Sequence, residues 1–430
     1  MRLSACLASE PPLDMPKAEQ AAVPRRHGPD LAGATRRARA LLFFIRDKQA
    51  APPTSAQWQR LGEAYNEGDG PADALVAWMQ AHGMARSRPL FEKALAEGIA
   101  VLPEAPEPLK AFFAHVDQDP PWLDRARVER GVQAGSLSSV TGMRVLRDFG
   151  LMAGYQAGGI NKTLVVTGAL DKGGVARRIA ETTQWCLDCT EAKGMERFGD
   201  GFKNTVRVRM IHALVRRHVA AHPQWNAAEW GLPINQVDMQ ATYLGFSAIY
   251  LLGQRLMGVI LRQQEAEDVM HLWRYTGWLM GVRDEWLCAS EQEGRIALYQ
   301  NLLSQAPPDE SSRLLGSALM DEPLSRHYPF AQSLRRRWDK QVHLSIVRLF
   351  VGAKGMRSLG LPAHVLPWYP CLFAPMNFLW FAVNRLLPGG FERLRRWGRA
   401  GHVAQAKIMF GSARPAILAM SNVKVPSPAP

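Results

Sequence analysis

Arg209, His212 and Arg216 are the residues whose types and spacing first suggest chemistry, because they set one imidazole between two guanidinium groups. At about 100° per residue, the three side chains fall on one face of a helix. Four apolar residues border that face: Val208, Ile211, Val215 and Val219. We therefore expect the imidazole to point into an apolar interior, with a guanidinium group about one turn away on each side.

Such an arrangement is suited to holding a haem iron. The imidazole of His212 would ligate the metal, and Arg209 and Arg216 would bind the anionic propionates of the cofactor. The same pattern also fits a buried core histidine that is satisfied by a backbone carbonyl, with two arginines at a helix surface. Both interpretations remain open at this point, since ligation by a single histidine has no strict local signature.

A second polar group lies upstream, where Arg178, Glu181 and Thr182 share one face of another helical stretch. Burial would raise the pKa of Glu181 and make this carboxylate a proton acceptor. The alternative is an ion pair between Glu181 and Arg178 or Arg177 that only fixes helix packing. Thr182 could donate a hydrogen bond to bound oxygen, although an interior threonine more often bonds the carbonyl one turn back. These three residues are the candidate catalytic groups.

The elements that carry these residues are predicted to be helices. Residues 175–190, 204–219, 236–259 and 265–281 each show helical periodicity. The run 163–167 is rich in β-branched residues, but it has no partner with period-two alternation, so it predicts a helix or turn. We predict an all-α fold with a single large helical domain, for which globin-like packing is one option.

Composition divides the chain into three parts. Residues 1–30 are rich in proline, alanine and charge without periodicity, which predicts a disordered leader. Residues 31–420 form the predicted helical domain, and residues 421–430 a flexible tail. The apolar stretch 366–388 is interrupted by prolines and two asparagines, so we expect it to lie against a membrane or close the core.

The chain is basic, with 52 Lys and Arg against 39 Asp and Glu, a formal charge of +13. This balance permits binding to nucleic acid, anionic lipid or a charged cofactor. Without zinc-finger spacing, an RNP-like motif or a basic leucine repeat, nucleic acid is not expected as a partner. Five cysteines argue against a disulfide framework. No signal peptide follows Arg25 and Arg26, which indicates a cytoplasmic protein, with membrane association as an option.

Two smaller motifs are assigned to structure rather than chemistry. Cys186 and Cys189 have Cys-x-x-Cys spacing, but they fall within a helical pattern with no second pair, which favours core packing over redox or zinc chemistry. His271 is a rival candidate for a metal ligand, and its apolar surroundings favour a packed core residue. Asn235 is expected to cap the helix that follows it.

Four motifs occur in order over about a hundred residues: Arg178-Ile-Ala-Glu-Thr182, Arg209-Met-Ile-His-Ala-Leu-Val-Arg216, Gly231-Leu-Pro-Ile-Asn-Gln236 and Leu272-Trp-Arg-Tyr-Thr-Gly277. The series resembles the haem-dependent oxygenase family that contains latex clearing protein (rubber oxygenase) and the MpaB oxygenase. The resemblance covers roughly residues 113–388 and begins weakly at Asp119-Pro-Pro-Trp122. It is most specific at Arg209, His212 and Arg216.

The resemblance implies a b-type haem in an all-α fold, with His212 as the proximal iron ligand. It also implies dioxygen as co-substrate and oxidative cleavage of a carbon-carbon double bond in a hydrophobic, isoprenoid or lipid-like substrate. In the rubber-cleaving members, the position matching Glu181 is a lysine that can ligate iron, and an upstream glutamate acts as base. Here the upstream region is Gly158-Gly-Ile-Asn-Lys162, without a carboxylate, so Glu181 becomes the candidate base.

The sequence thus predicts an oxidoreductase, a haem b-dependent oxygenase. Two other classes remain as alternatives. One is a haem-binding sensor or carrier without turnover. The other is a basic helical scaffold that binds a membrane or another protein and carries no cofactor.

Overall fold

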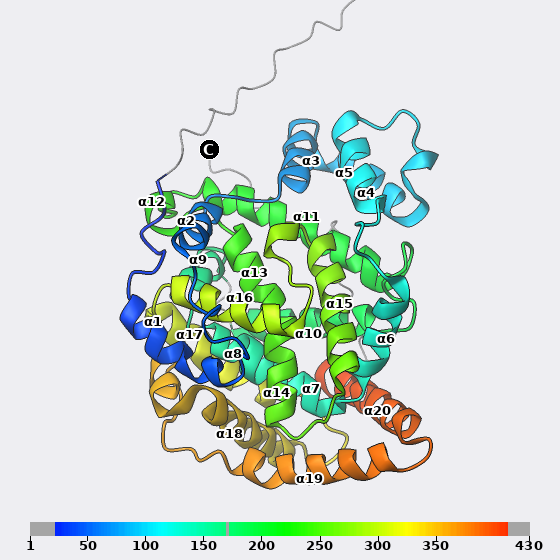
Figure 1. The fold of residues 1–430 in the computed structure, drawn as a ribbon. Helices are drawn as coiled ribbons and strands as arrows, with labels where there is room; N and C mark the ends of the chain where they lie inside the picture. The colour runs from blue at the N-terminus through cyan, green and yellow to red at the C-terminus, as the bar shows by residue number, and fades with distance from the viewer. Residues whose placement is uncertain (1–21, 169–171, 412–430) are drawn as a thin grey trace, which may run out of the picture.

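The computed structural model describes residues 22–168 and 172–411, and every regular element within these ranges is a helix (Figure 1). The predicted all-α fold is confirmed. Residues 163–167 lie in the last turns of α9 (Gly158–Val166) and in the residue that caps it, so this β-branched run is helical as expected. The predicted tail 421–430 lies outside the described residues.

The N-terminal helices are α1 (Leu31–Ala38), α2 (Ser55–Ala64), α3 (Gly70–Ala81), α4 (Met84–Glu97) and α5 (Glu107–Asp117). Helices α3 to α5 form one end of the molecule, at the top of Figure 1. Short 3-10 segments η1 (Arg39–Phe43) and η2 (Ile99–Val101) interrupt this region. Each of α2 and α3 begins at a residue whose side chain accepts a backbone N–H of the first turn, Thr54 and Asp69.

The central helices are α6 (Arg125–Ser136), α7 (Ser139–Val145), α8 (Met152–Gly154), α9, α10 (Lys172–Cys189), α11 (Asp200–Ala220), α12 (Ala227–Trp230), α13 (Gln236–Leu244), α14 (Tyr250–Leu256), α15 (Gln263–Leu279) and α16 (Glu291–Ser304). Two π-helical turns, η3 (Leu146–Leu151) and η4 (Gly245–Ile249), pack against each other between them. A 3-10 turn, η5 (Asp284–Trp286), follows α15.

The C-terminal helices are α17 (Glu310–Met320), α18 (Gln332–Ser358), α19 (Trp368–Leu386) and α20 (Gly390–Phe410), with the 3-10 turn η6 (Glu322–Ser325) before α18. Helix α18 is kinked at Gly352, whose φ of 65° leaves the helical region. The apolar stretch 366–388 forms the single helix α19, which runs along the lower edge of the molecule in Figure 1. No helix within the described ranges combines the length and apolar character needed to cross a membrane.

The main core joins α3, α5, α6, α11, α13 and α15. Helices α6 and α15 lie side by side (Figure 1) and approach closely at Gly131, where a Cβ atom would come within 2.3 Å of the carbonyl oxygen of Asp268. Only glycine fits at this crossing. A second core cluster lies between α8, α10, α17 and α18, so α10 borders both clusters.

Part of the predicted leader packs on the helical domain. Arg26 is buried, and its guanidinium group donates two hydrogen bonds to the carboxylate of Asp238 at 2.9 and 2.6 Å. It also lies over the ring of Tyr65, 4.5 Å from the centroid. Residues 22–30 therefore belong with the domain that was expected to begin at residue 31. The earlier part of the leader lies outside the described residues.

Candidate functional site

Helices α10 and α11 form a hairpin that carries all six candidate residues. Near the connecting loop the helices are tied together, because Trp185 Nε1 donates to Thr205 Oγ1 at 2.9 Å. Away from the loop their packing partners differ. Val175 and Ile179 of α10 pack in the second core cluster, whereas α11 packs against α3. The candidate residues lie on these parts of the two helices.

His212 lies on the core-facing side of α11 and is half-buried. Its Nδ1 atom is fully buried and has no hydrogen-bond partner among the described residues. Burial lowers the pKa of His212 to about 4; Arg216 lowers it further, and Asp69 opposes the shift. The imidazole is therefore neutral near pH 7, which is the form that ligates a metal.

Arg209 is buried and paired. Its Nε and Nη2 atoms donate to the two carboxylate oxygens of Asp69 at 2.6 and 2.8 Å, and its Nη1 donates to the carbonyl oxygen of Leu279 at 3.3 Å. The guanidinium group also lies 5.3 Å from the ring centroid of Phe112. Asp69 is the residue that caps α3, so this bidentate pair joins the histidine helix to the cap of α3.

The other flanking cation, Arg216, is bound in the same way. It pairs with Asp73 in the first turn of α3, and its Nε and Nη2 atoms donate to the carbonyl oxygen of Ile234 at 3.2 and 3.0 Å. Burial raises the pKa of Asp73, and Arg216 opposes that shift. The prediction that both arginines share the buried face with His212 is confirmed, but their described partners are protein carboxylates and carbonyls. Contact with propionates stays a prediction.

The two aspartates were not singled out in the sequence. Asp69 and Asp73 are about 140 positions from their partners along the chain, and no local pattern links them to the histidine helix. The only signal is their place at the start of α3, which also satisfies ordinary helix capping. Gly281 completes this junction. Its φ is 92°, and a Cβ atom there would come within 2.2 Å of Asp69 Oδ2.

On α10, Glu181 is about one quarter exposed and its nearest cation is Arg177, at 3.8 Å. Burial raises the pKa of Glu181, while Arg177 and Arg178 oppose the shift. The ion pair that was weighed as an alternative to catalysis is therefore present, at long range and with Arg177. No hydrogen bond or ion pair between described residues joins Glu181 to His212.

Packing is incomplete along the facing sides of the hairpin. Thr182 is exposed, although Ile179 and Trp185 on the same side of α10 are buried. On α11, the apolar neighbours of His212 are also only half-buried: Val208, Ile211 and Val215. Arg178 is half-buried as well. Of the six candidate residues, the two arginines of α11 are thus buried. The other four are partly or fully exposed: Arg178, Glu181, Thr182 and His212.

The motif at 231–236 is structural. Asn235 caps α13 by accepting the N–H of Asp238 at 3.0 Å, as predicted. Gln236 is buried and donates to the carbonyl oxygens of Gly68 and Gly281 at 2.8 and 3.0 Å. The amide therefore joins the loop before α3 to the loop after α15, close to the junction of Asp69 with Arg209.

His271 is a packed core residue, as predicted. Its Nε2 atom accepts the backbone N–H of Asp124 at 3.0 Å, so the lone pair needed for metal binding is already used. Its ring also contacts Trp122 edge-on, with centroids 5.8 Å apart. Arg274, one turn further on, lies over the same indole at 4.0 Å. The segment 119–122 is thereby fixed to α15.

The two cysteines of the Cys-x-x-Cys motif, Cys186 and Cys189, are protonated thiols packed in the core. Burial raises the pKa of Cys186 to about 12 and raises that of Cys189 as well, so both groups remain thiols. Cys189 Sγ lies 3.5 Å from Thr205 Oγ1. The described residues contain no group of three or more His, Cys, Asp or Glu side chains that could hold a metal ion.

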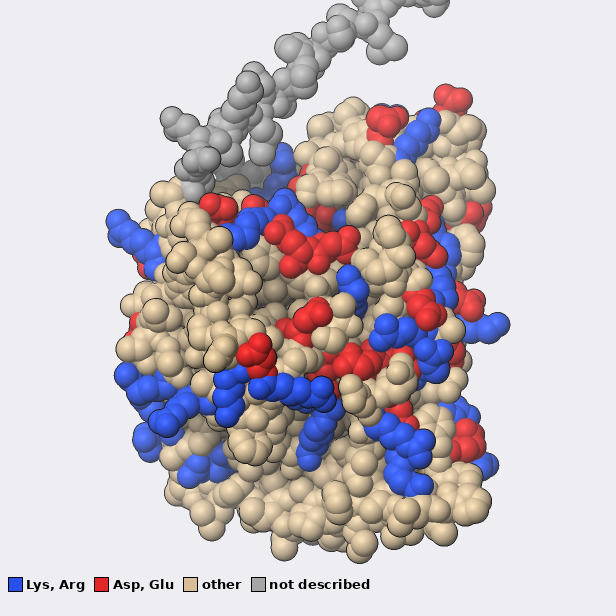
Figure 2. All heavy atoms as spheres, viewed as in Figure 1, with Lys and Arg blue, Asp and Glu red and all other residues tan. Residues whose placement is uncertain are grey.

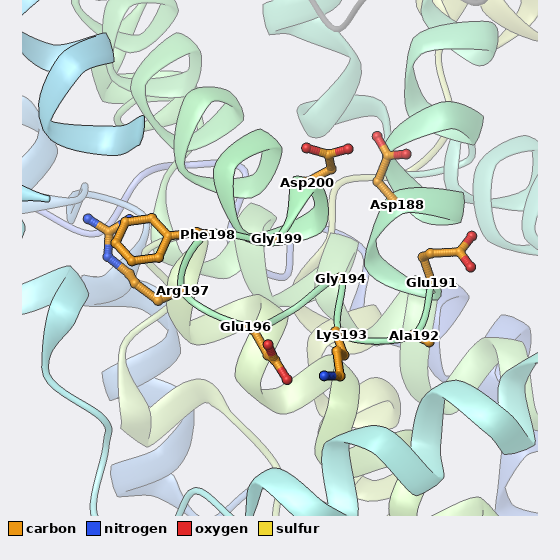
Figure 3. A pocket seen from close by; sticks show the side chains of 10 residues that line it. All are labelled: Asp188, Glu191, Ala192, Lys193, Gly194, Glu196, Arg197, Phe198, Gly199 and Asp200. Atoms are coloured by element: carbon orange, nitrogen blue, oxygen red, sulfur yellow. The ribbon is translucent and has the colours of Figure 1, made fainter. Parts of the chain in front are cut away.

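The loop between α10 and α11 encloses a hollow of about 760 Å³ (Figure 3). Its lining is polar and includes Asp188 and Asp200, whose carboxylates lie at the facing ends of the two helices (Figure 3). Asp188 accepts hydrogen bonds from Gln184 at 2.6 Å and from Asn204 at 2.8 Å. The hollow is thus part of the hairpin's closed end and includes none of the six candidate residues.

The chain is similar to known proteins over part of its length. Residues 143–382 match the family described as ER-bound oxygenase mpaB/B'/Rubber oxygenase, catalytic domain. The chain is 28% identical over 189 residues to a rubber oxygenase from Streptomyces sp. (strain K30), which covers 43% of this chain and 46% of that protein. The match thus spans about half of that relative's length.

The fold is similar to that of a solved structure of latex clearing protein in the closed state, with a TM-score of 0.56 and 21% identity. The similarity covers 79% of this chain and 91% of the other. The family match includes all four sequence motifs: those of α10, α11 and α15, and the segment 231–236, which leads into α13. The chain belongs to the MpaB and rubber oxygenase catalytic-domain family.

Proposed function

We propose that this protein is a haem b-dependent oxygenase that holds the haem iron through His212 and oxidises a hydrophobic alkene with dioxygen. The observation that carries this proposal is the state of the His212 ring. A buried polar atom without a partner costs roughly 1–3 kcal/mol. Nδ1 of His212 is such an atom, and the ring is held neutral by burial. A ligand that engages Nδ1 would offset that cost.

The surroundings of His212 fit a flat apolar group. The half-buried valines and isoleucine of α11 are apolar, and the buried cations on either side are already neutralised by Asp69 and Asp73. A bound haem supplies the iron at which dioxygen is activated. The residues of this chain would supply the ligating imidazole of His212, exclude water along α11 and hold the imidazole in its orientation.

In this proposal, Arg209 and Arg216 are positioning residues that fix the helix carrying His212. Each joins α11 to α3 through a carboxylate, one turn before and one turn after His212. The two ion pairs fix α11 on either side of His212. Residues that position a metal ligand commonly act in this way. A direct contact with the propionates, the role first expected, would require the guanidinium groups to share donors that the aspartates now use.

Glu181 is proposed as the proton acceptor on the opposite arm of the hairpin. Its raised pKa makes it a stronger base than an exposed glutamate. Arg178 and Thr182 are proposed to orient the bound oxygen or the substrate on the same side. Arg177, which is largely exposed, can release Glu181 at little cost because an exposed pair at 3.8 Å is weak.

The substrate is proposed to be isoprenoid or polyisoprene-like, since a relative carries the name rubber oxygenase. Adding both atoms of dioxygen across a carbon-carbon double bond gives two carbonyl groups and needs no reductant. The absence of a carboxylate in the segment 158–162 distinguishes this chain from the rubber-cleaving pattern. We therefore expect a shorter or differently substituted alkene to be the better substrate.

The test is an absorption spectrum of the purified protein, with the haem identified as its pyridine haemochrome. The proposal predicts a Soret band and one haem b per chain. Oxygen uptake with a polyprenyl alkene then separates an oxygenase from a sensor or carrier, which would show the band without uptake. A protein purified from haem-supplemented cells without a Soret band would contradict the proposal.

A further inference from the structure

Helix α19 presents an apolar face to solvent. Its exposed residues are all apolar: Cys371, Leu372, Pro375, Met376, Phe378, Leu379, Trp380, Val383 and Leu386. Leu372, Met376, Leu379, Val383 and Leu386 recur at spacings of three and four, so they form one stripe along the helix. An ordinary surface helix shows the reverse pattern, with its polar side outward.

The polar residues of α19 are turned inward. Asn377 Nδ2 donates to the carbonyl oxygen of Met257 at 2.9 Å. Arg385 donates two hydrogen bonds to Glu265, at 2.8 and 2.6 Å, and one to the carbonyl oxygen of Ile260 at 3.0 Å. The helix is therefore fixed to the protein by polar contacts, and its apolar stripe is left outward.

The apolar surface continues onto both neighbouring helices. Trp338 of α18 meets Trp368 of α19 with ring centroids 5.1 Å apart, and Trp380 of α19 meets Trp397 of α20 at 6.1 Å. Two exposed residues of α18 four positions apart, Leu334 and Trp338, extend the surface, and the exposed Phe330 lies just before this helix. We call the exposed apolar residues of α18, α19 and α20 the C-terminal apolar face.

The segment that forms the C-terminal apolar face is rich in basic residues. Residues 332–410, which include α18, α19 and α20, contain 13 Lys and Arg and two Asp and Glu, a formal charge of +11 within a chain of +13. Arg337 is exposed beside Trp338, and Arg396 is exposed beside Trp397. A shallow groove of about 470 Å³ on α20 is lined by Arg395, Arg396, Arg399 and Lys407. Figure 2 shows an uncharged lower edge, where α19 lies, with blue residues above it.

We propose that the C-terminal apolar face docks on the surface of an anionic phospholipid bilayer. Aliphatic side chains would enter the acyl boundary, indoles would lie at headgroup level, and the arginines would meet the phosphates. This inference does not depend on the proposed haem chemistry. Because no described helix can span a bilayer, α19 would lie in the plane of the interface.

Charge favours lipid over a second copy of the chain. A symmetric dimer through this face would bring two basic segments together, and like charges such as those of the exposed Arg337 and Arg396 repel across such a contact. An anionic bilayer satisfies both the apolar stripe and the cations. If the protein does not bind anionic vesicles, a partner of another kind, such as an acidic protein, would have to cover this face.

The experiment is flotation of the full-length protein with vesicles of phosphatidylcholine alone, or of phosphatidylcholine mixed equally with phosphatidylglycerol. We expect binding to the mixed vesicles that weakens as salt is raised, and much less binding to neutral vesicles. The double variant Leu379→Glu with Val383→Glu should lower the partition coefficient by more than about tenfold, because two apolar contacts become anionic. Arg337→Gln with Arg396→Gln should lower it by roughly fivefold per residue.

The matched control is Leu31→Glu with Phe43→Glu. Both residues are exposed, Phe43 at 84%, and both belong to the first helical segments, at the left of Figure 1 and away from α19. The control makes the same change in charge at two exposed apolar positions away from α19, so it should bind vesicles nearly like the parent protein. If the control and the α19 variant lose binding equally, net charge alone explains the result and the proposal is wrong.

Cys371 gives a second readout, because it is exposed on α19 while Cys189 and Cys288 are buried and the Cys186 thiol has its pKa raised to about 12. A polarity-sensitive fluorophore at Cys371, in a Cys6→Ser background, should shift to the blue on adding anionic vesicles. A fluorophore that does not shift contradicts the proposal. So does a Cys371 that resists labelling before lipid is added, or a dimer in solution that the Leu379→Glu, Val383→Glu variant dissociates.

Discussion

Helices α11 and α19 both break the usual pattern of a surface helix, and they do so in opposite ways. Helix α11 carries two arginines on its buried side, and each is matched by an aspartate of α3 or its cap. Helix α19 carries a stripe of large apolar residues on its exposed side, and nothing in the described protein covers it. The first helix buries charge at a cost that its partners offset, and the second exposes apolar surface without compensation.

The difference indicates where a ligand is expected. On α11 the two buried arginines are paired, and the remaining cost lies in one atom, Nδ1 of His212. That concentration of cost in a single ring points to a small, specific ligand. On α19 the cost is spread along the helix, which points to an extended partner. Departures from ordinary local patterns occur at functional sites in many proteins, and here the two kinds of departure point to two kinds of site.

The largest effect is expected from breaking the pair that fixes α11. Arg209→Leu leaves Asp69 buried and unpaired, so the free energy of unfolding should fall by about 3–5 kcal/mol. Chemical denaturation followed by circular dichroism measures this change. The double variant Arg209→Leu with Asp69→Leu should recover much of the loss, and Arg209→Lys should lie between. If Arg209→Leu is as stable as the parent protein, the ion pair with Asp69 does not stabilise the fold.

The second prediction concerns the loss of stability at acid pH, to which the buried His402 contributes. His402 on α20 is buried, its Nε2 donates to the carbonyl oxygen of Ser139 at 3.0 Å, and burial lowers its pKa to about 4. In the unfolded chain a histidine has a pKa near 6.5, so the unfolded state takes up a proton at a higher pH than the folded state does. The contribution of His402 to the free energy of unfolding is therefore complete above pH 6.5 and is lost as the pH falls towards 4. The loss is about 3 kcal/mol for this group. His402→Gln should flatten that part of the stability profile, and an unchanged slope would contradict the assignment.

Glu181 is expected to affect turnover more than structure. Glu181→Gln removes the base and keeps the shape, so turnover should fall by roughly a hundredfold with haem content unchanged. Arg177→Gln is the matched control, because it breaks the ion pair and leaves the carboxylate. If both variants lose the same activity, the pair is structural. Glu181→Lys should give a six-coordinate low-spin ferric spectrum, and an unchanged spectrum would remove α10 from the iron's distal side.

The smallest effect is expected on α19. Leu379→Glu with Val383→Glu alters only exposed side chains, so the free energy of unfolding should change by less than about 0.5 kcal/mol per residue. Thermal or chemical unfolding in the absence of lipid measures this value. A large loss would mean that the C-terminal apolar face is packed inside the protein, and the contrast with α11 would disappear.

Local sequence pattern predicted the helices and the shared face well. The spacing of Arg209, His212 and Arg216 requires one helix face, and Asn235 is placed where a helix begins. The charge partners could not be predicted, since Asp69 and Asp73 reach α11 only through the tertiary fold. The same holds for Arg26, which was assigned to a disordered leader and is buried against Asp238, 212 positions away. The outward direction of the α19 stripe also depends on packing, because periodicity fixes a face without saying what it meets.

The proposed iron ligand, His212, is tested most directly by haem content. The measurement is haem per chain, by pyridine haemochrome, in His212→Ala and in His218→Ala, which makes the same substitution on the same helix. We expect His212→Ala to lose haem while its helical circular dichroism persists, and His218→Ala to retain haem. Full haem occupancy and an unchanged Soret band in His212→Ala would contradict this proposal.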